Sequence, residues 1–183
     1  MPANTPATDT VPQMTSRRPR VVPLLFLVAS LVLLLGALVI EHVMGIAPCI
    51  LCLYQRIPPA VAVPLAALAL WPRVPAAWAR RLTVMVALVF VAGAVLAGYH
   101  VGVEQHWWAG TAQCGGDAAA PPDLSTDLTA LRRALEAPEV VPCDAIPWSF
   151  VGISLAGYNM IGSMGLAVLG LWAAGRRALW RES

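Results

Sequence analysis

Charge is scarce in this sequence, and lysine is missing from it altogether. Only 12% of the 183 residues are charged, whereas 58% are hydrophobic. Soluble domains carry about 25% charged residues, so this composition excludes an ordinary soluble protein and indicates a protein of the lipid bilayer. We expect no nucleic-acid partner for such a chain. Because lysine is absent, the arginines alone report how the chain is oriented in the membrane.

Four apolar stretches follow one another along the chain, and none of them contains Asp, Glu, Lys or Arg. A helix of about 20 apolar residues crosses the roughly 30 Å of hydrocarbon in a bilayer. We therefore predict an all-α membrane protein, a four-helix transmembrane bundle with spans at 21–40, 57–71, 82–103 and 146–174. The second span is short and contains three prolines, so we expect it to begin irregularly and to kink.

The arginines are distributed unevenly around these spans. Nine of the twelve fall in the tail 1–20, the loop 72–81 and the tail 175–183. The positive-inside rule places these three segments in the cytoplasm, so the loops 41–56 and 104–145 lie on the outer side. We interpret the first span as a retained anchor, because no small-x-small cleavage site follows it, and the N-terminal tail as disordered.

Two of the four cysteines form a Cys-x-x-Cys motif in the first outer loop, Cys49 and Cys52. A disulfide between them closes a ring of four residues, which contributes only about 2 kcal/mol of stability. Such a bridge suits electron exchange better, because its opening and reclosing are intramolecular. No histidine follows Cys52, which excludes covalent c-type haem. The spacing of the four cysteines does not form two zinc knuckles either, so we expect no metal.

The other two cysteines, Cys114 and Cys143, lie in the second outer loop. A bridge between them closes a ring of about 30 residues and contributes roughly 3.5 kcal/mol, so a structural role and an exchange role both remain open. Glycines beside Cys114 favour access of an incoming thiolate to its sulfur. Leucines recur at helical spacing between the two cysteines, which predicts a short amphipathic helix on the membrane surface: Leu124, Leu128, Leu131 and Leu135.

Together these motifs resemble the DsbB family of quinone-dependent disulfide-bond formation proteins. The resemblance covers four spans with both ends inside, the later cysteine pair, and the segments His42-Val43-Met44, Pro48 to Cys52, Tyr54-Gln55-Arg56, Pro147-Trp148 and 152–157. It implies a bacterial inner-membrane thiol oxidase that reoxidises a periplasmic thioredoxin-like oxidant of the DsbA type. The two electrons then pass to the membrane quinone pool, as ubiquinone or menaquinone. This family's electron chain keeps the bacterial periplasm oxidising.

The resemblance also implies a catalytic role for each cysteine. Cys114 is attacked by the reduced partner, which frees Cys143. Cys143 then attacks Cys49, and Cys52 leaves as a thiolate facing the quinone. The implied disulfides are Cys49–Cys52 and Cys114–Cys143. This order agrees with the chemistry of exchange, which needs an attacking thiolate, an accessible sulfur and a stabilised leaving group.

Two further residues are candidates for quinone binding. A lone arginine beside a span, Arg56, either extends toward lipid headgroups or stabilises the Cys52 thiolate or a quinone oxygen, and the resemblance favours the second account. The family has a polar position near the outer end of the third span, which falls on His106 or Gln105. His100, near the same end, is expected only to find a hydrogen bond at the interface.

Two functions of other classes remain open on the sequence alone. A membrane thiol enzyme of the vitamin K epoxide reductase type also uses Cys-x-x-Cys in a four-span core. A structural four-span protein with two inert bridges is the second alternative. Quinol formation on adding a reduced thiol protein distinguishes both from the thiol oxidase.

Overall fold

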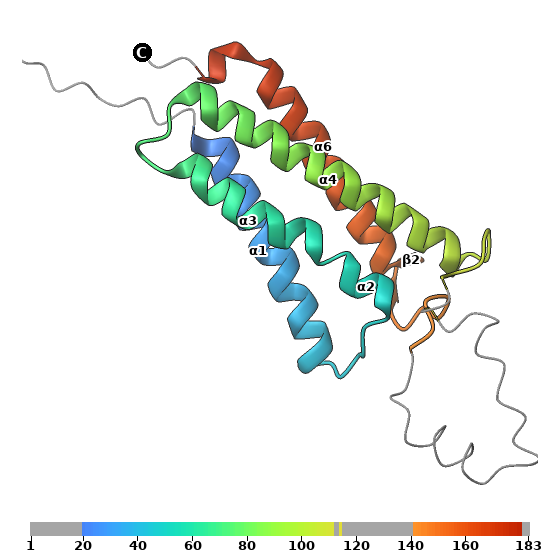
Figure 1. The fold of residues 1–183 in the computed structure, drawn as a ribbon. Coiled ribbons are helices and arrows are strands. Elements are labelled where there is room, and N and C mark those ends of the chain that lie inside the picture. The colour runs from blue at the N-terminus through green and yellow to red at the C-terminus, as the bar shows by residue number, and fades with distance from the viewer. Residues whose placement is uncertain (1–19, 112–113, 115–140, 181–183) are drawn as a thin grey trace, which may run out of the picture.

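Helices dominate the computed structural model, which describes residues 20–111, 114 and 141–180. In this described part, four helical segments are long and apolar enough to cross a membrane, which confirms the predicted four-helix membrane bundle (Figure 1). They are α1 (Val21–His42), α2 (Ile50–Tyr54) continued by α3 (Ile57–Leu70), α4 (Ala76–Glu104) and α6 (Leu155–Gly175). The N-terminal tail and the predicted amphipathic helix lie outside the described residues.

The second span is divided into α2 and α3 by a turn at Gln55 and Arg56. Pro58 and Pro59 occupy the first turn of α3, where a helix has no use for their missing N–H groups. The same prolines cannot donate to the carbonyls of the preceding turn, so α2 cannot run directly into α3. The irregular start expected from the prolines therefore lies within the span, immediately after the Cys-x-x-Cys motif.

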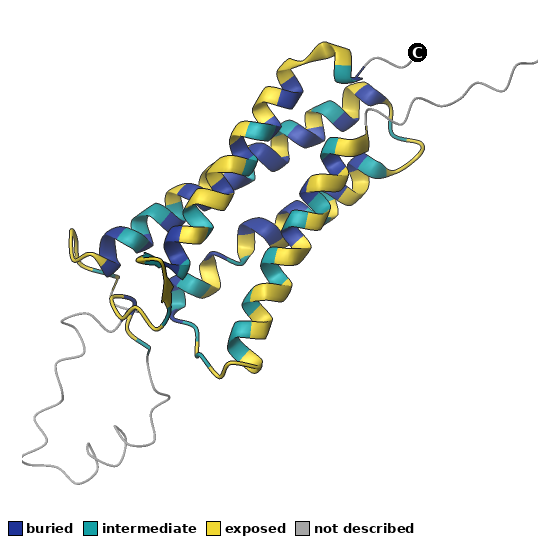
Figure 2. Ribbon diagram, turned by 180° about the vertical axis from the view of Figure 1, so that it is seen from behind, coloured by how far each residue is buried: buried dark blue, intermediate teal, exposed yellow. Residues whose placement is uncertain are grey.

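The middle of the bundle is packed with small residues and two aromatic rings. Phe26 and Phe90 stack with centroids 5.8 Å apart, in a buried cluster that also contains three alanines and a valine. A Cβ added at Gly170 would lie 2.7 Å from Phe26 Cζ, so this glycine allows α6 to approach α1 and α4 closely. Many large apolar residues of the helices are exposed, as expected for a lipid-facing surface. Figure 2 shows exposed residues along the outside of the bundle.

The fourth predicted span begins with a hairpin instead of a helix. β1 (Ser149–Phe150) pairs antiparallel with β2 (Ile153–Ser154) through a turn in which Gly152 has a φ of 76°. Glycine tolerates this left-handed conformation at little cost. Helix α6 then begins at Leu155, with the Ser154 hydroxyl accepting from Gly157 N–H as its N-cap. This start corrects the predicted span of 146–174.

All described cysteines lie at one end of the bundle, which we call the cysteine end: Cys49, Cys52, Cys114 and Cys143. The opposite end holds the start of α1, the loop 71–75 and a 3₁₀ helix, η4 (Arg177–Trp180) (Figure 1). A small apolar cluster closes it, formed by Ala69, Ala79, Leu82 and Trp180. Helix α4 is the longest element at 29 residues and reaches both ends.

Candidate redox site at the cysteine end

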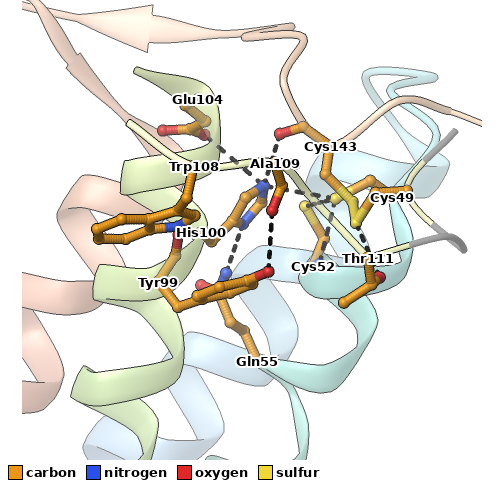
Figure 3. The surroundings of a disulfide bond; sticks show 11 residues. Cys49, Cys52, Gln55, Tyr99, His100, Glu104, Trp108, Ala109, Thr111 and Cys143 are labelled. Carbon is orange, nitrogen blue, oxygen red and sulfur yellow. Dashed lines mark hydrogen bonds and ion pairs between the residues drawn. A yellow bond between two sulfur atoms is a disulfide. The ribbon is translucent and has the colours of Figure 1, made fainter. Parts of the chain in front are cut away.

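The two cysteine pairs, far apart in the sequence, meet in one buried cluster. Cys114 and Cys143 form a disulfide with their Cα atoms 5.0 Å apart, and both are buried. Cys49 packs in the same cluster, and Cys52 lies against it. Figure 3 shows the sulfur atoms of Cys49 and Cys143 on the same side of α4. This placement brings together the groups that a disulfide exchange between the pairs requires.

Cys49 and Cys52 are free thiols in the structure, whereas the sequence analysis predicted a disulfide between them. Their sulfur atoms lie 3.0 Å apart in a hydrogen bond, which is the arrangement of a reduced pair. Cys49 also caps α2, because its sulfur accepts from Cys52 N–H at 3.3 Å. The hydrogen bond with Cys52 outweighs the effect of burial and holds the pKa of the Cys49 thiol below its usual range.

His100 on α4 lies between the two pairs and is only 2% exposed. Its Nε2 is 3.6 Å from Cys49 Sγ and 3.1 Å from the carbonyl oxygen of Cys143. Its Nδ1 is 2.6 Å from Nε2 of Gln55, whose Oε1 accepts from Asn159 on α6 at 2.6 Å. The sequence analysis expected only an interfacial hydrogen bond for His100. One feature of the sequence could have identified His100 as a functional residue. It is an ionisable residue inside a predicted span, and such residues are rare and usually functional.

Glu104, the last residue of α4, is also buried, with 6% of its surface exposed. One carboxylate oxygen lies 3.9 Å from His100 Nε2, and the other accepts from the Ser154 hydroxyl at 2.5 Å. The sequence analysis placed Glu104 only as the first residue of the outer loop 104–145. It instead joins the end of α4 to the start of α6, because the β1–β2 hairpin brings Ser154 over it.

Arg56 forms an ion pair with Glu41 on α1, with 2.6 Å between nitrogen and oxygen. The side chains of Arg56 and Glu41 are 23% and 28% exposed, so the pair is partly shielded from solvent. Neither alternative considered from the sequence included this partner. The pair connects α1 to the turn between α2 and α3. It therefore holds the Arg56 guanidinium in a fixed place, shortly after Cys49 and Cys52 in the chain.

A cavity of about 260 Å³ lies beside the reduced pair, between α1 and the starts of α2, α3 and α6. Its polar lining includes both thiols together with Gln55, Arg56 and His100. Apolar side chains make up most of the remainder, and they continue along α1 from Ile40 back to Val32. The site thus combines a dithiol, a positive charge and an elongated apolar chamber.

These features agree with a comparison against known protein families. The family described as Disulfide bond formation protein DsbB matches residues 19–173 of the chain. The chain belongs to the DsbB family. Its four apolar helices and this membership make it a multi-pass protein of the bacterial inner membrane and a disulfide oxidoreductase.

Three curated relatives match between 80% and 87% of the length of this DsbB-family chain. The Disulfide bond formation protein B of Stutzerimonas stutzeri is 30% identical over 167 residues, covering 87% of this chain and 96% of the relative. That of Herminiimonas arsenicoxydans is 32% identical over 165 residues, covering 85% and 96%. That of Saccharophagus degradans is 31% identical over 147 residues, covering 80% and 87%. No solved structure matches the chain significantly.

His106 and Gln105, the alternative third-span candidates in this DsbB-family protein, do not line the cavity beside the reduced pair. His106 is exposed in a left-handed conformation with a φ of 57°, and it lines a second cavity of about 210 Å³ beside Cys114 and Asp144. Gln105 is exposed at the end of α4. Their expected part in quinone use stays a prediction, and neither residue is among those described as lining the cavity of the reduced pair.

The reduced pair also offers a potential set of metal ligands. The sulfur atoms of Cys49 and Cys52 and a ring nitrogen of His100 lie within 4.8 Å of one another. Thiolate and imidazole donors suit soft or borderline ions such as zinc. The sequence analysis expected no metal in this DsbB-family protein, and that expectation stays a prediction.

Proposed function

We propose that this protein reoxidises a periplasmic thioredoxin-like oxidant of the DsbA type and passes the two electrons to membrane quinone, ubiquinone or menaquinone. The observation that carries the proposal is the contact of both cysteine pairs in one buried cluster, beside a cavity that both thiols line. The arginine distribution supports an orientation in which both termini are cytoplasmic and the cysteine end is periplasmic.

The exchange begins at the Cys114–Cys143 disulfide. A thiolate of the reduced partner attacks Cys114, the Cys114–Cys143 bond breaks, and Cys143 leaves as a thiolate. Cys143 attacks Cys49 of an oxidised Cys49–Cys52 pair, a Cys49–Cys143 bond forms, and Cys52 leaves as a thiolate. The second thiol of the partner then resolves the mixed disulfide, so the partner departs oxidised and Cys114 is released.

The last steps return the protein to its starting state. Cys114 attacks Cys143, which re-forms the Cys114–Cys143 bond and releases Cys49 as a thiolate. The Cys49 and Cys52 thiols then give two electrons and two protons to the quinone, which leaves as quinol, and their own disulfide re-forms. This scheme requires a closed Cys114–Cys143 disulfide and two free thiols immediately before quinone reduction, and the bonding of the four cysteines in the structure is compatible with that requirement.

The cavity beside the reduced pair suits a quinone in shape and polarity. Binding sites for small molecules are mostly apolar with a few placed polar groups, and this cavity has that composition. The Arg56 guanidinium supplies a positive charge for an oxygen that gains electrons. Along α1 the lining includes Gly36, an exposed residue beside which a Cβ would meet nothing within 4 Å. An isoprenoid tail would leave the cavity along this open side of α1.

The proposal is tested by measuring quinone reduction with the purified full-length protein in lipid nanodiscs. Reduced DsbA-type oxidant should support multiple turnovers of ubiquinone or menaquinone, and parallel assays with each identify the preferred acceptor. The Cys114→Ser/Cys143→Ser double variant should lose turnover driven by the partner and keep quinone reduction driven by dithiothreitol. Absence of quinol in every assay with folded protein would refute the thiol oxidase and favour a structural role.

The order of exchange has its own test. In Cys143→Ala the resolving sulfur is missing, so a mixed disulfide between Cys114 and the partner should accumulate and be visible by non-reducing mass spectrometry. Attachment of the partner at Cys49 would show that the two pairs act in the reverse order. A vitamin K epoxide reductase-type enzyme would instead show reduction of vitamin K epoxide by the purified protein.

A further inference from the structure

His100 has contacts on both cysteine pairs, and neither the motif nor the proposed electron path assigns it a role. The carbonyl that it contacts belongs to Cys143, in the outer loop after α4, and the sulfur that it contacts belongs to Cys49, before α2. The imidazole is therefore a bridge between two segments that are not adjacent in the chain (Figure 3). The titratable groups beside its ring are Cys49, Cys52 and Glu104.

The hydrogen-bond pattern around His100 determines which ring nitrogen carries hydrogen. The Asn159 amide donates to Gln55 Oε1, which leaves the Gln55 amide to donate to His100 Nδ1. Because Nδ1 accepts, the neutral ring carries its hydrogen on Nε2. Asn159 in turn accepts from the Ser163 hydroxyl at 3.4 Å. A polar chain from α6 through the α2–α3 turn thus directs an N–H group toward the cysteines.

We propose that His100 is a positioning residue for exchange between the two cysteine pairs, holding the Cys143 backbone beside Cys49 and donating to the Cys49 sulfur when it leaves as a thiolate. The inference rests on the proposed function and specifies the step in which Cys114 attacks Cys143. In that step the Cys114–Cys143 bond forms and the Cys49–Cys143 bond breaks. The electron pair of the broken bond goes to Cys49, next to His100 Nε2.

Burial makes this contact effective. In a site closed to water, an N–H group held in place stabilises a developing anion without the reorganisation that solvent would need. A hydrogen bond to a charged group contributes more than one between neutral groups. The depressed pKa of the Cys49 thiol has Cys52 as its main cause and the His100 hydrogen bond as a further one. The Gln55 and Asn159 amides keep the ring from turning its acceptor nitrogen toward the sulfur.

The experiment measures exchange in quinone-free full-length protein, so that electron transfer to quinone does not contribute. Oxidised protein is mixed with reduced DsbA-type partner, quenched with acid and alkylated, and the appearance of Cys49 and Cys52 thiols is followed by mass spectrometry. His100→Leu should slow this appearance by about 10- to 100-fold, the effect of losing one hydrogen bond to a charged group. His100→Gln, which retains a donor near the Nε2 position, should recover part of the rate.

A second readout distinguishes positioning from packing. In the Cys52→Ala background, the pH midpoint for alkylation of Cys49 by iodoacetamide should move to higher pH when His100→Leu is added, because the thiolate loses a donor. The matched control is His42→Leu, since His42 is an exposed histidine whose ring contacts only its own helix among the contacts described, at Leu38. This control should change neither the exchange rate nor the midpoint.

If His100→Leu does not fold, Asn159→Leu tests the same inference. This variant leaves the imidazole in place and removes only the amide that orients Gln55 toward it. It should slow exchange and raise the Cys49 midpoint, each less than His100→Leu. Exchange at the wild-type rate in a folded His100 variant, or slower exchange with an unmoved midpoint, would overturn the inference. Failure of the proposed function looks different, because the wild-type protein itself would then release no thiols.

Discussion

The two ends of the bundle bury very different groups. At the cysteine end the buried side chains include Gln55, His100, Glu104 and Ser154, which are linked to one another in a chain of contacts. His100 connects this chain to the Cys49 sulfur. At the opposite end the described side-chain hydrogen bonds from Arg80, Trp180 and Thr83 all go to main-chain carbonyls. The first two of these carbonyls lie at the end of α6. The other contacts there are an apolar cluster and two cation–π contacts, of Arg81 with Trp78 and of Arg176 with Trp172.

This difference indicates that the groups responsible for chemistry lie at the cysteine end, whereas the contacts at the opposite end serve the stability of the bundle. Donors that satisfy the last carbonyls of a helix serve its termination. Polar side chains buried among themselves in a membrane protein are expensive and are retained where they do work on a substrate. Substitutions at the cysteine end should therefore change activity first, and substitutions in the apolar packing should change stability first.

The largest expected effect is at the reduced pair. Cys49→Ser and Cys52→Ser should each abolish steady-state quinone reduction, because neither cysteine alone can alternate between dithiol and disulfide. Thermal unfolding in nanodiscs should change little, since a four-residue ring contributes only about 2 kcal/mol. Normal turnover in either variant would remove the Cys-x-x-Cys motif from the electron path.

The next largest effect is expected for the Arg56 guanidinium. Arg56→Ala should raise the apparent Michaelis constant for quinone about 5- to 150-fold, corresponding to about 1 to 3 kcal/mol for a charge acting in a partly shielded site. Arg56→Lys should recover part of this effect, because lysine keeps the charge without the planar fork. The matched control is Arg80→Ala at the opposite end, which should weaken stability and leave this constant unchanged.

Substitutions in the packed middle of the bundle should lower stability and leave quinone reduction unchanged. In Gly170→Ala the new methyl group meets Phe26 and Ala87 at 2.7 and 2.8 Å, so the free energy of unfolding should fall by about 1 to 3 kcal/mol. Gly162→Ala, on the same helix with nothing within 4 Å, is the control. Quinone reduction at temperatures where the protein stays folded should be close to wild type in both. A loss of activity confined to Gly170→Ala would mean that the two ends are coupled.

The smallest effect is expected at His106. Because its side chain is exposed and lies in the second cavity, His106→Ala should change the Michaelis constant for quinone less than about twofold, or about 0.4 kcal/mol. His106→Gly should raise the melting temperature slightly, since glycine adopts the left-handed backbone without a Cβ penalty. A large rise in the constant would return His106 to the quinone site.

Much of the fold was predictable because hydrocarbon imposes a simple rule on sequence. Apolar runs of sufficient length marked the four helices, and the prolines marked the irregular second span. The start of α6 was not predictable, because residues 146–154 are apolar enough to pass for helix. Only the left-handed turn at Val151 and Gly152, which pairs two strands of two residues each, reveals the hairpin. Strands so short carry no alternation pattern.

The candidate site was predictable where it depended on motifs and hidden where it depended on packing. The Cys-x-x-Cys spacing indicated the first pair, the resemblance to the DsbB family implied the second, and the position of a lone arginine beside a span drew attention to Arg56. The contacts of His100, Gln55 and Asn159 join α4, the turn between α2 and α3, and α6, so no local pattern in the sequence contains them. The partner of Arg56 was hidden for the same reason, since Glu41 belongs to another helix and lies 15 residues earlier in the chain.

The five-residue helix α2 has a consequence for the timing of motion. Its main-chain bonds amount to little more than one turn, including Leu53 N–H to Cys49 O and Gln55 N–H to Leu51 O. A single turn opens locally at far lower free energy than a long packed helix such as α4. We expect deuterium to replace the α2 amide hydrogens well before those in the middle of α4. The distance between the sulfur atoms of Cys49 and Cys52 can therefore change through local opening of α2 while the long helices of the bundle stay folded.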